Sequence, residues 1–183
     1  MTGQPPATGD RARAAGPPRP WAAGVCDGAH AAGVTDVVYV PDNPLSFILR
    51  EFEARRRDVR LILATREEEA FGIAAGLYLG GRRPAVMLQS SGLGNSVNAL
   101  GTLVVPYEIP MLIVVSMRGG ETEWNPVQAP MGSAVRPIFD AIGIPHVTAP
   151  DAAVSDTVRE AGAAAFATRI PHAVLLPRRL TAS

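Results

Sequence analysis

The chain has 183 residues, a length that suits one domain with an ample core. Its formal charge is zero and it has no basic or acidic block, so nucleic acid and anionic membrane surfaces are poor candidates for partners. Every basic residue is an arginine, which excludes the lysine chemistry of Schiff bases and of phosphate-binding loops.

Residues 1–19 are rich in proline, glycine and arginine and lack the apolar centre of a secretory signal. We expect them to form a disordered tail ahead of one domain at residues 20–183. No apolar run has the length of a membrane span. The single cysteine, Cys26, lies in an apolar helical pattern and is expected in the core. A chain without a second cysteine fits a cytoplasmic protein.

The first elements follow from hydrophobic spacing. Residues 21–32 predict a helix closed by Gly33 in the left-handed conformation. Residues 36–40 form a short apolar run, which is typical of a parallel strand covered on both faces. Pro41 ends this strand, and a second helix follows whose arginines at residues 55–57 are expected to be a solvated end. The residues expected in its buried stripe are Leu45, Ile48, Leu49 and Phe52.

A strand at residues 59–63 leads into a helix with the sequence TREEEAFGIAAGLYLGG. Thr65 is a suitable N-cap that can form a capping box with Glu68, and the three carboxylates meet the positive end of the helix dipole. Successive helical residues point about 100° apart, so only one carboxylate can face a given pocket. Residues 70–79 carry no charge and are expected to be buried all round. Glu67, at the edge of that surface, should have a raised pKa and can donate a hydrogen bond as a neutral acid.

The rest of the chain continues the alternation of short apolar runs and helical patterns. We expect strands at residues 84–88, 111–116, 146–148 and 172–176, and helices at residues 95–104, 135–142 and 151–168. A tight turn at residues 92–94 and a long polar loop at residues 117–132, with tryptophan and methionine anchors, connect them. A loop of that length is usually functional. The pattern predicts an α/β fold, a three-layer parallel sheet with helices on both faces.

Ligands of such sheets bind beyond the carboxyl ends of the strands, and several polar residues fall there. Each also has a structural reading. Asp42 can cap the following helix, Gly92 and Gly94 can serve only a turn, and Arg118 can be an ordinary loop arginine. Asn95 nevertheless favours a site near the glycines, and a strand end with no other cation nearby favours an anion-binding role for Arg118. The histidines have no partners at metal-binding spacing and are expected to be structural: His30, His146 and His172.

Four motifs in chain order resemble the pyrimidine-binding domain of thiamine-diphosphate enzymes. They are VPDN at residues 40–43, the spacing of Glu67, Ala70, Ala74 and Gly76, the segment SSGLGNSVNAL, and a later RG…Q…G. The set is most similar to phosphonopyruvate and sulfopyruvate decarboxylases, and the resemblance spans residues 21–177.

This resemblance implies that Glu67 bonds the pyrimidine ring of thiamine diphosphate and favours the imino tautomer, whose nitrogen takes a proton from the thiazolium carbon. The cofactor then acts as an electron sink while a 2-oxo acid loses carbon dioxide. The residues that it implies for cofactor binding are Pro41, Glu67, Ser91, Gly92 and Asn95. Those that it implies for substrate binding are Asp42, Asn43, Ser90, Leu93, Arg118 and Gln128.

The family's diphosphate-binding half carries a GDG motif followed by an asparagine, and this chain lacks both. Its one Gly-Asp pair is at residues 9–10. The resemblance therefore implies a partner subunit with the GDG…N motif, which holds the diphosphate and Mg²⁺, in a heterotetramer or larger assembly. The small-residue helix at residues 70–79 agrees with a subunit interface. Two alternatives stay open: a subunit of an acetolactate-synthase-like carboligase, and a non-catalytic homologue or stand-alone binding module.

Overall fold

The computed structural model describes residues 19–120 and 123–182. The expected tail therefore lies outside the described residues except for Arg19, whose guanidinium stands 4.8 Å from the centroid of the Phe47 ring. Within the described ranges, no helix is long and apolar enough to cross a membrane.

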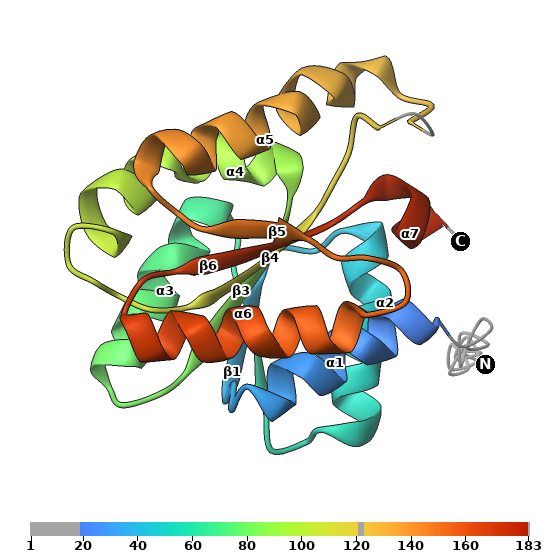
Figure 1. Cartoon of the computed structure of the whole chain (residues 1–183). Helices are drawn as coiled ribbons and strands as arrows, with labels where there is room; N and C mark the ends of the chain where they lie inside the picture. Colours follow the sequence, from blue (N-terminus) through green and yellow to red (C-terminus); the bar gives the residue numbers. More distant parts are fainter. Residues whose placement is uncertain (1–18, 121–122, 183) are drawn as a thin grey trace, which may run out of the picture.

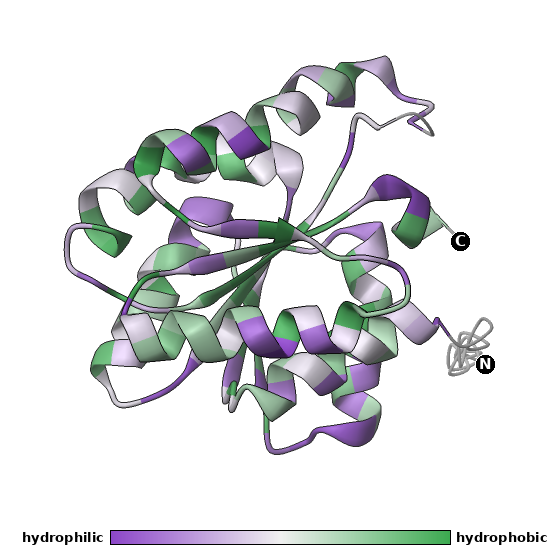
Figure 2. Ribbon diagram, in the orientation of Figure 1, coloured by the Kyte–Doolittle hydropathy of each residue, from purple (hydrophilic) through white to green (hydrophobic). Residues whose placement is uncertain are grey.

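Six parallel strands form one sheet in the order β2-β1-β3-β4-β6-β5 (Figure 1). Each of them overlaps a predicted strand. The central strands β3, β4 and β6 are almost wholly buried and hydrophobic, because helices cover both of their faces (Figure 2). The strands are β1 Asp36–Tyr39, β2 Arg60–Leu63, β3 Pro84–Gln89, β4 Leu112–Ser116, β5 His146–Thr148 and β6 His172–Leu176.

Two hydrophobic cores, one on each face of the sheet, confirm the three-layer prediction. One core is built with α1 (Pro20–Ala31), α2 (Asn43–Arg55) and α6 (Val154–Thr168). The other is built with α3 (Glu67–Leu79), α4 (Ser90–Ala99) and α5 (Ala129–Ile142). Shorter segments are the π-helix η1 (Leu100–Val104), which ends where the predicted helix at residues 95–104 ends, the 3-10 helix η2 (Pro126–Gln128) and α7 (Arg178–Ala182). Neither η2 nor α7 was predicted.

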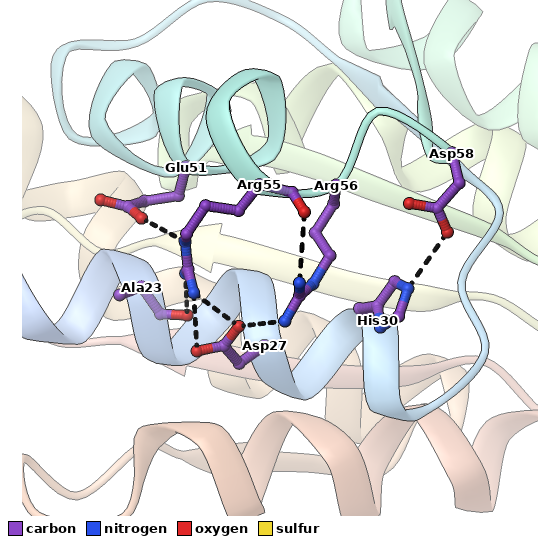
Figure 3. A network of polar contacts seen from close by, with 7 residues as sticks. All are labelled: Ala23, Asp27, His30, Glu51, Arg55, Arg56 and Asp58. Carbon is purple, nitrogen blue, oxygen red and sulfur yellow. Dashed lines mark hydrogen bonds and ion pairs between the residues drawn. The ribbon is translucent and has the colours of Figure 1, made fainter.

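Polar contacts fasten α1 to α2 on the outside of the first core (Figure 3). The arginines expected to be a solvated helix end are partly engaged: Arg55 and Arg56 each place a guanidinium nitrogen 2.9 Å from the same Asp27 oxygen. His30 has a structural partner, since its Nε2 lies 3.1 Å from a carboxylate oxygen of Asp58. Cys26 is fully buried as predicted, and this burial raises the pKa of its thiol to about 11.

Asp36, at the start of β1, is a fully buried carboxylate. It accepts hydrogen bonds from Nε of Arg60 at 2.5 Å, Nε of Arg82 at 2.7 Å and Oγ1 of Thr35 at 2.7 Å. Burial alone would raise the pKa of Asp36, but the hydrogen bonds from these partners hold it below the ordinary value. The cluster therefore joins the amino ends of β1, β2 and β3.

Two predicted helix starts were wrong by five residues or more, and glycine and proline explain both; α6 begins three residues later than predicted. The tight turn expected at residues 92–94 does not exist, because α4 begins at Ser90 directly after β3 and contains Gly92 and Gly94. Helix α5 begins at Ala129 and not at residue 135, with Pro130 in its first turn, where the missing N–H is harmless. The polar loop is accordingly shorter than predicted. Its expected tryptophan anchor, Trp124, is 77% exposed.

Helix α3 is not buried all round in this chain. Ala70, Phe71 and Ala74 face the second core, whereas Gly72 and Gly76 are exposed. Leu79 at the end of the helix is 78% exposed. In a three-layer fold only one side of an outer helix packs on the sheet, so the apolar outer side of α3 is left uncovered.

Candidate active site

The carboxyl ends of β1 and β3 meet at a topological switch point. Strand β1 lies between β2 and β3, so the chain passes from β1 to its neighbour on one side and then crosses over to its neighbour on the other side. Crevices at such points are the usual ligand sites of open parallel sheets. The predicted residues after these strands therefore lie where the fold favours a ligand.

Asp42, the first polar side chain after β1, links the ends of three strands. Its carboxylate accepts hydrogen bonds from Nε2 of Gln89 at 3.0 Å and from Oγ of Ser116 at 2.6 Å. Ser91 extends this hydrogen-bond network, because its hydroxyl donates to Oε1 of Gln89 at 2.6 Å. Asp42 does occupy the N-cap position of α2, but its side chain makes no capping hydrogen bond, so the capping interpretation was wrong.

The three carboxylates that open α3 have different environments. Glu69 accepts hydrogen bonds from N and Oγ1 of Thr65 at 2.7 and 2.5 Å, which lower its pKa. The N-cap position of α3 is occupied by Arg66, so the predictions of Thr65 as the N-cap and of a capping box with Glu68 were wrong. Glu68 instead lies 3.7 Å from Arg66, in an exposed pair. These two carboxylates serve local structure.

Glu67, the remaining carboxylate, is half-buried and packs against α4. A side chain at Gly92 would overlap Cγ, Cδ and Oε1 of Glu67, so only glycine permits this close approach. No donor among the described residues hydrogen-bonds the carboxylate of Glu67. Gly92 thus sets the position of Glu67, and the carboxylate keeps its capacity to accept from a ligand.

The other predicted site residues lie on α4 and in the segments that follow β1 and precede α5. Ser90 is fully buried, and its Oγ has no hydrogen-bond partner within the described ranges. Leu93 is fully buried in the second core. Gln128 ends η2 and is half-buried. The exposed members of the predicted set are Pro41, Asn43, Ser91 and Asn95.

Arg118, after β4, forms a two-pronged pair with Glu123. Its Nε lies 2.6 Å from Oε2 and its Nη2 lies 2.8 Å from Oε1, and the Glu123 side chain is only 3% exposed. Hydrogen bonds from Arg118 lower the pKa of Glu123 to about 2. Nε of Arg178 lies 3.8 Å from the same carboxylate. The expectation that no other cation is near Arg118 was therefore wrong.

Two glycines hold the loop after β4 against the start of α5. Gly119 has φ of 77°, and a side chain there would meet Cα of Ala129 at 2.7 Å. A side chain at Gly132 would overlap the carbonyl oxygen of Arg118. Backbone therefore packs directly on backbone, which fixes the position of Arg118.

Sequence reasoning missed Gln89, Ser116 and Glu123. The first two left a signal, because each is a polar residue at the end of an otherwise apolar strand, in PAVMLQ and LIVVS. Glu123 left none, since its burial depends on the path of the loop. The remaining histidines are locally satisfied: Nδ1 of His172 lies 3.0 Å from the carbonyl oxygen of Ile170, and His146 lies beside the ring of Phe139.

The features around Glu67 fit an aminopyrimidine cofactor. A half-buried carboxylate with no protein donor can bond a ring nitrogen, and Gly92 supplies a surface without a side chain beside it. The buried hydroxyl of Ser90 adds a polar group whose bonding the described residues do not satisfy.

Comparison with known proteins gave matches over most of the chain. Residues 21–133 match a family model described as the N-terminal TPP binding domain of thiamine pyrophosphate enzymes. Sulfopyruvate decarboxylase subunit alpha of Methanococcus maripaludis is 39% identical over 147 residues, which are 79% of this chain and 87% of that subunit. The corresponding subunit of Methanocaldococcus jannaschii is 43% identical over 106 residues, 58% of this chain and 62% of that one.

Longer and more distant proteins also match. Phosphonopyruvate decarboxylase of Streptomyces viridochromogenes is 32% identical over 167 residues, 88% of this chain but only 41% of the relative. The structure of 2-oxoglutarate:ferredoxin oxidoreductase from Magnetococcus marinus matches with a TM-score of 0.68 and 15% identity, over 88% of this chain and 29% of that one. At that identity the likeness shows a common fold.

Proposed function

The chain belongs to the thiamine pyrophosphate enzymes, whose N-terminal cofactor-binding domain it carries, and we propose that it is the pyrimidine-binding subunit of a two-subunit decarboxylase. The proposed substrate is a 3-substituted pyruvate of the sulfopyruvate or phosphonopyruvate type. The observation that carries the proposal is the packing of Glu67 on Gly92, while Glu68 and Glu69 serve local contacts.

Thiamine diphosphate, when bound, supplies the electron sink that the loss of carbon dioxide from a 2-oxo acid requires. Glu67 would hold a proton between its carboxylate and a pyrimidine ring nitrogen, and so favour the imino form of the ring. Gly92 keeps that carboxylate in place. Pro41, Ser91 and Asn95 would be further cofactor contacts, and Ser90, Asp42, Asn43, Leu93, Gln128 and Arg118 would be the substrate-side residues.

A partner subunit would supply the diphosphate and magnesium sites, since the GDG…N motif is absent from this sequence. The naming of the relatives as alpha subunits supports a partner. The uncovered outer side of α3 also supports a partner. A Cβ atom added to Gly72 or to Gly76 would meet no atom within 4 Å, so this side of the helix has room for another subunit. We place the complex in the cytoplasm, as a heterotetramer or larger.

The purified chain should by itself show no decarboxylase activity and bind thiamine diphosphate weakly. Titration calorimetry with and without magnesium checks this expectation. Tight, magnesium-dependent binding by the chain alone would contradict the two-subunit arrangement.

Glu67→Gln in the reconstituted complex tests the function itself. Turnover should fall on the order of 10²–10⁴-fold, because an amide cannot exchange the proton that the ring nitrogen needs. Glu68→Gln, the matched control one residue along the helix, should retain near-normal turnover. Equal losses would mean that the carboxylates only stabilise the helix. Product analysis separates the decarboxylase, which releases an aldehyde, from a carboligase, which joins two carbonyl compounds.

A further inference from the structure

A cavity of ≈ 260 Å³ lies beyond the carboxyl ends of β4 and β6, between the loop after β4, the first turns of α5 and α7. A water molecule in the liquid occupies about 30 Å³, so the cavity has room for a group of several heavy atoms. Its polar lining consists of Arg118, Gly119, Ser133, Arg136, Arg178 and Arg179.

The cavity is strongly cationic. Four arginines line it, and no carboxylate is among its described lining residues. Three carboxylates meet these arginines: Glu123 pairs with Arg118 and lies 3.8 Å from Nε of Arg178, Asp151 lies 3.4 Å from Nη2 of Arg179, and Asp42 interacts electrostatically with Arg118. Four guanidiniums against three carboxylates leave one excess positive charge in this part of the described structure. Such an excess in a concave site attracts anions.

Donors are available as well as charge. Arg118 uses Nε and Nη2 on Glu123, and Arg136 uses one nitrogen on the hydroxyl of Thr148 at 2.9 Å. The Arg178 side chain makes no hydrogen bond to any described residue, although it is only 18% exposed and its Nε is buried. A largely buried guanidinium without hydrogen bonds is costly unless a ligand accepts from it.

We propose that this cavity binds the tetrahedral oxyanion, a sulfonate or phosphonate, at the far end of the substrate, with Arg136, Arg178 and Arg179 as its principal donors. This assignment rests on the proposed function. It shifts the main contact away from Arg118, whose fork already serves Glu123. Planar guanidinium forks suit tetrahedral oxyanions, which accept several hydrogen bonds at once.

The position of the cavity suits a ligand that reaches from the cofactor. Strand β4 is the direct neighbour of β3, and β6 is the next strand along. Adjacent strands are about 4.8 Å apart, so the cavity lies roughly 5–10 Å along the sheet edge from the end of β3. Glu67 packs on Gly92 immediately after β3. A short substrate with its oxo group at the cofactor can therefore place its far anion among the arginines.

The first arm of the test measures anion binding by this chain without the partner subunit. Sulfate titrated against wild type should bind more tightly than acetate, by calorimetry at constant ionic strength. Arg179→Gln and Arg136→Gln should each weaken sulfate binding about ten- to a hundredfold. Arg159→Gln, an exposed arginine of α6 that pairs with Asp156 and Glu160, is the matched control and should bind sulfate like wild type. Equal binding by all variants would overturn the proposal.

The second arm measures kinetics of the complex with sulfopyruvate and with pyruvate. Both cavity variants should raise the KM for sulfopyruvate about ten- to a hundredfold, while kcat and the KM for pyruvate stay near wild type. The variants could instead abolish sulfate binding and leave the KM for sulfopyruvate unchanged. That result would show a site for free phosphate or sulfate and would overturn the substrate assignment. A complex that turns over no 3-substituted pyruvate would instead refute the proposed function, and the first arm would still report on the cavity.

Discussion

Replacing Gly92 with alanine should separate the stability of this chain from its catalytic competence. The new methyl group would overlap three side-chain atoms of Glu67, which are normally no closer than about 3.5 Å to another carbon. Glu67 therefore has to retreat by about 1 Å or more, since the backbone of α4 is fixed between β3 and the second core. A displacement of that size in a catalytic group typically costs on the order of 10²-fold in rate.

Stability should hardly change in the same variant. Alanine in a helix interior is favoured over glycine by about 0.5–1 kcal/mol. Pushing the Glu67 side chain off its rotamer costs about 0.5–1.5 kcal/mol. These terms oppose each other, so the free energy of unfolding should shift by no more than about 1 kcal/mol.

Gly94→Ala provides the matched control, because it makes the same chemical change two residues along the helix. Its methyl group would meet only the flexible end of Met131, with Cε at 2.9 Å. Carbon dioxide release by the reconstituted complex and urea unfolding of this chain measure the two effects. Wild-type turnover in Gly92→Ala, or equal losses at both glycines, would refute the idea that Gly92 positions the carboxylate.

Three further substitutions test other contacts. Asp36→Asn should lower the free energy of unfolding, measured in urea, by about 2–3 kcal/mol. This loss is smaller than the loss from breaking a fully buried ion pair, because the partly exposed Arg60 and Arg82 can be solvated once the carboxylate is gone. The Glu123 pKa of about 2, against an ordinary 4.5, means that its ionised form stabilises the fold above pH 4.5 and that this contribution is lost as the pH falls toward 2. Glu123→Gln should be less stable at pH 7 and lose less stability over that window, and parallel pH profiles would contradict this reasoning. Gly76→Ala should stabilise the isolated chain by about 0.5–1 kcal/mol but weaken its association with the partner, as sedimentation would show; unchanged association would argue against an interface on α3.

Apolar runs bounded by glycine or proline made most of the fold predictable. The strand His172–Leu176 was predicted with its observed limits, because buried parallel strands need continuous apolar residues. The limits of His146–Thr148 were also predicted correctly, although this edge strand is only partly buried. The start of α4 was missed since its glycines look like a turn, whereas their purpose is contact with Glu67 and Met131. These contacts join residues that are brought together only by the fold, so the sequence around the two glycines does not indicate them.

The candidate site, like the fold, could be predicted from the sequence only in part. Glu67 could be singled out from helix periodicity and from the absence of charge in the residues that follow it. The contacts around Asp42 could not, because Gln89 and Ser116 lie 47 and 74 residues further along the chain. The pairing of Arg118 with Glu123 spans only five residues, yet it depends on a loop conformation that Gly119 and Gly132 impose.

The strand order also governs how the sheet can assemble during synthesis. Strand β6 is translated after both β4 and β5 but lies between them, and β5 pairs with no other strand. A nascent chain that has not yet produced β6 leaves the hydrophobic edge of β4 open and β5 unpaired, which invites aggregation. Helix α6, made just before β6, packs on α1 from the start of the domain, so closure joins segments far apart in the sequence and should be slow. Pulsed hydrogen exchange should therefore show the amides of β5 becoming protected no earlier than those of β6.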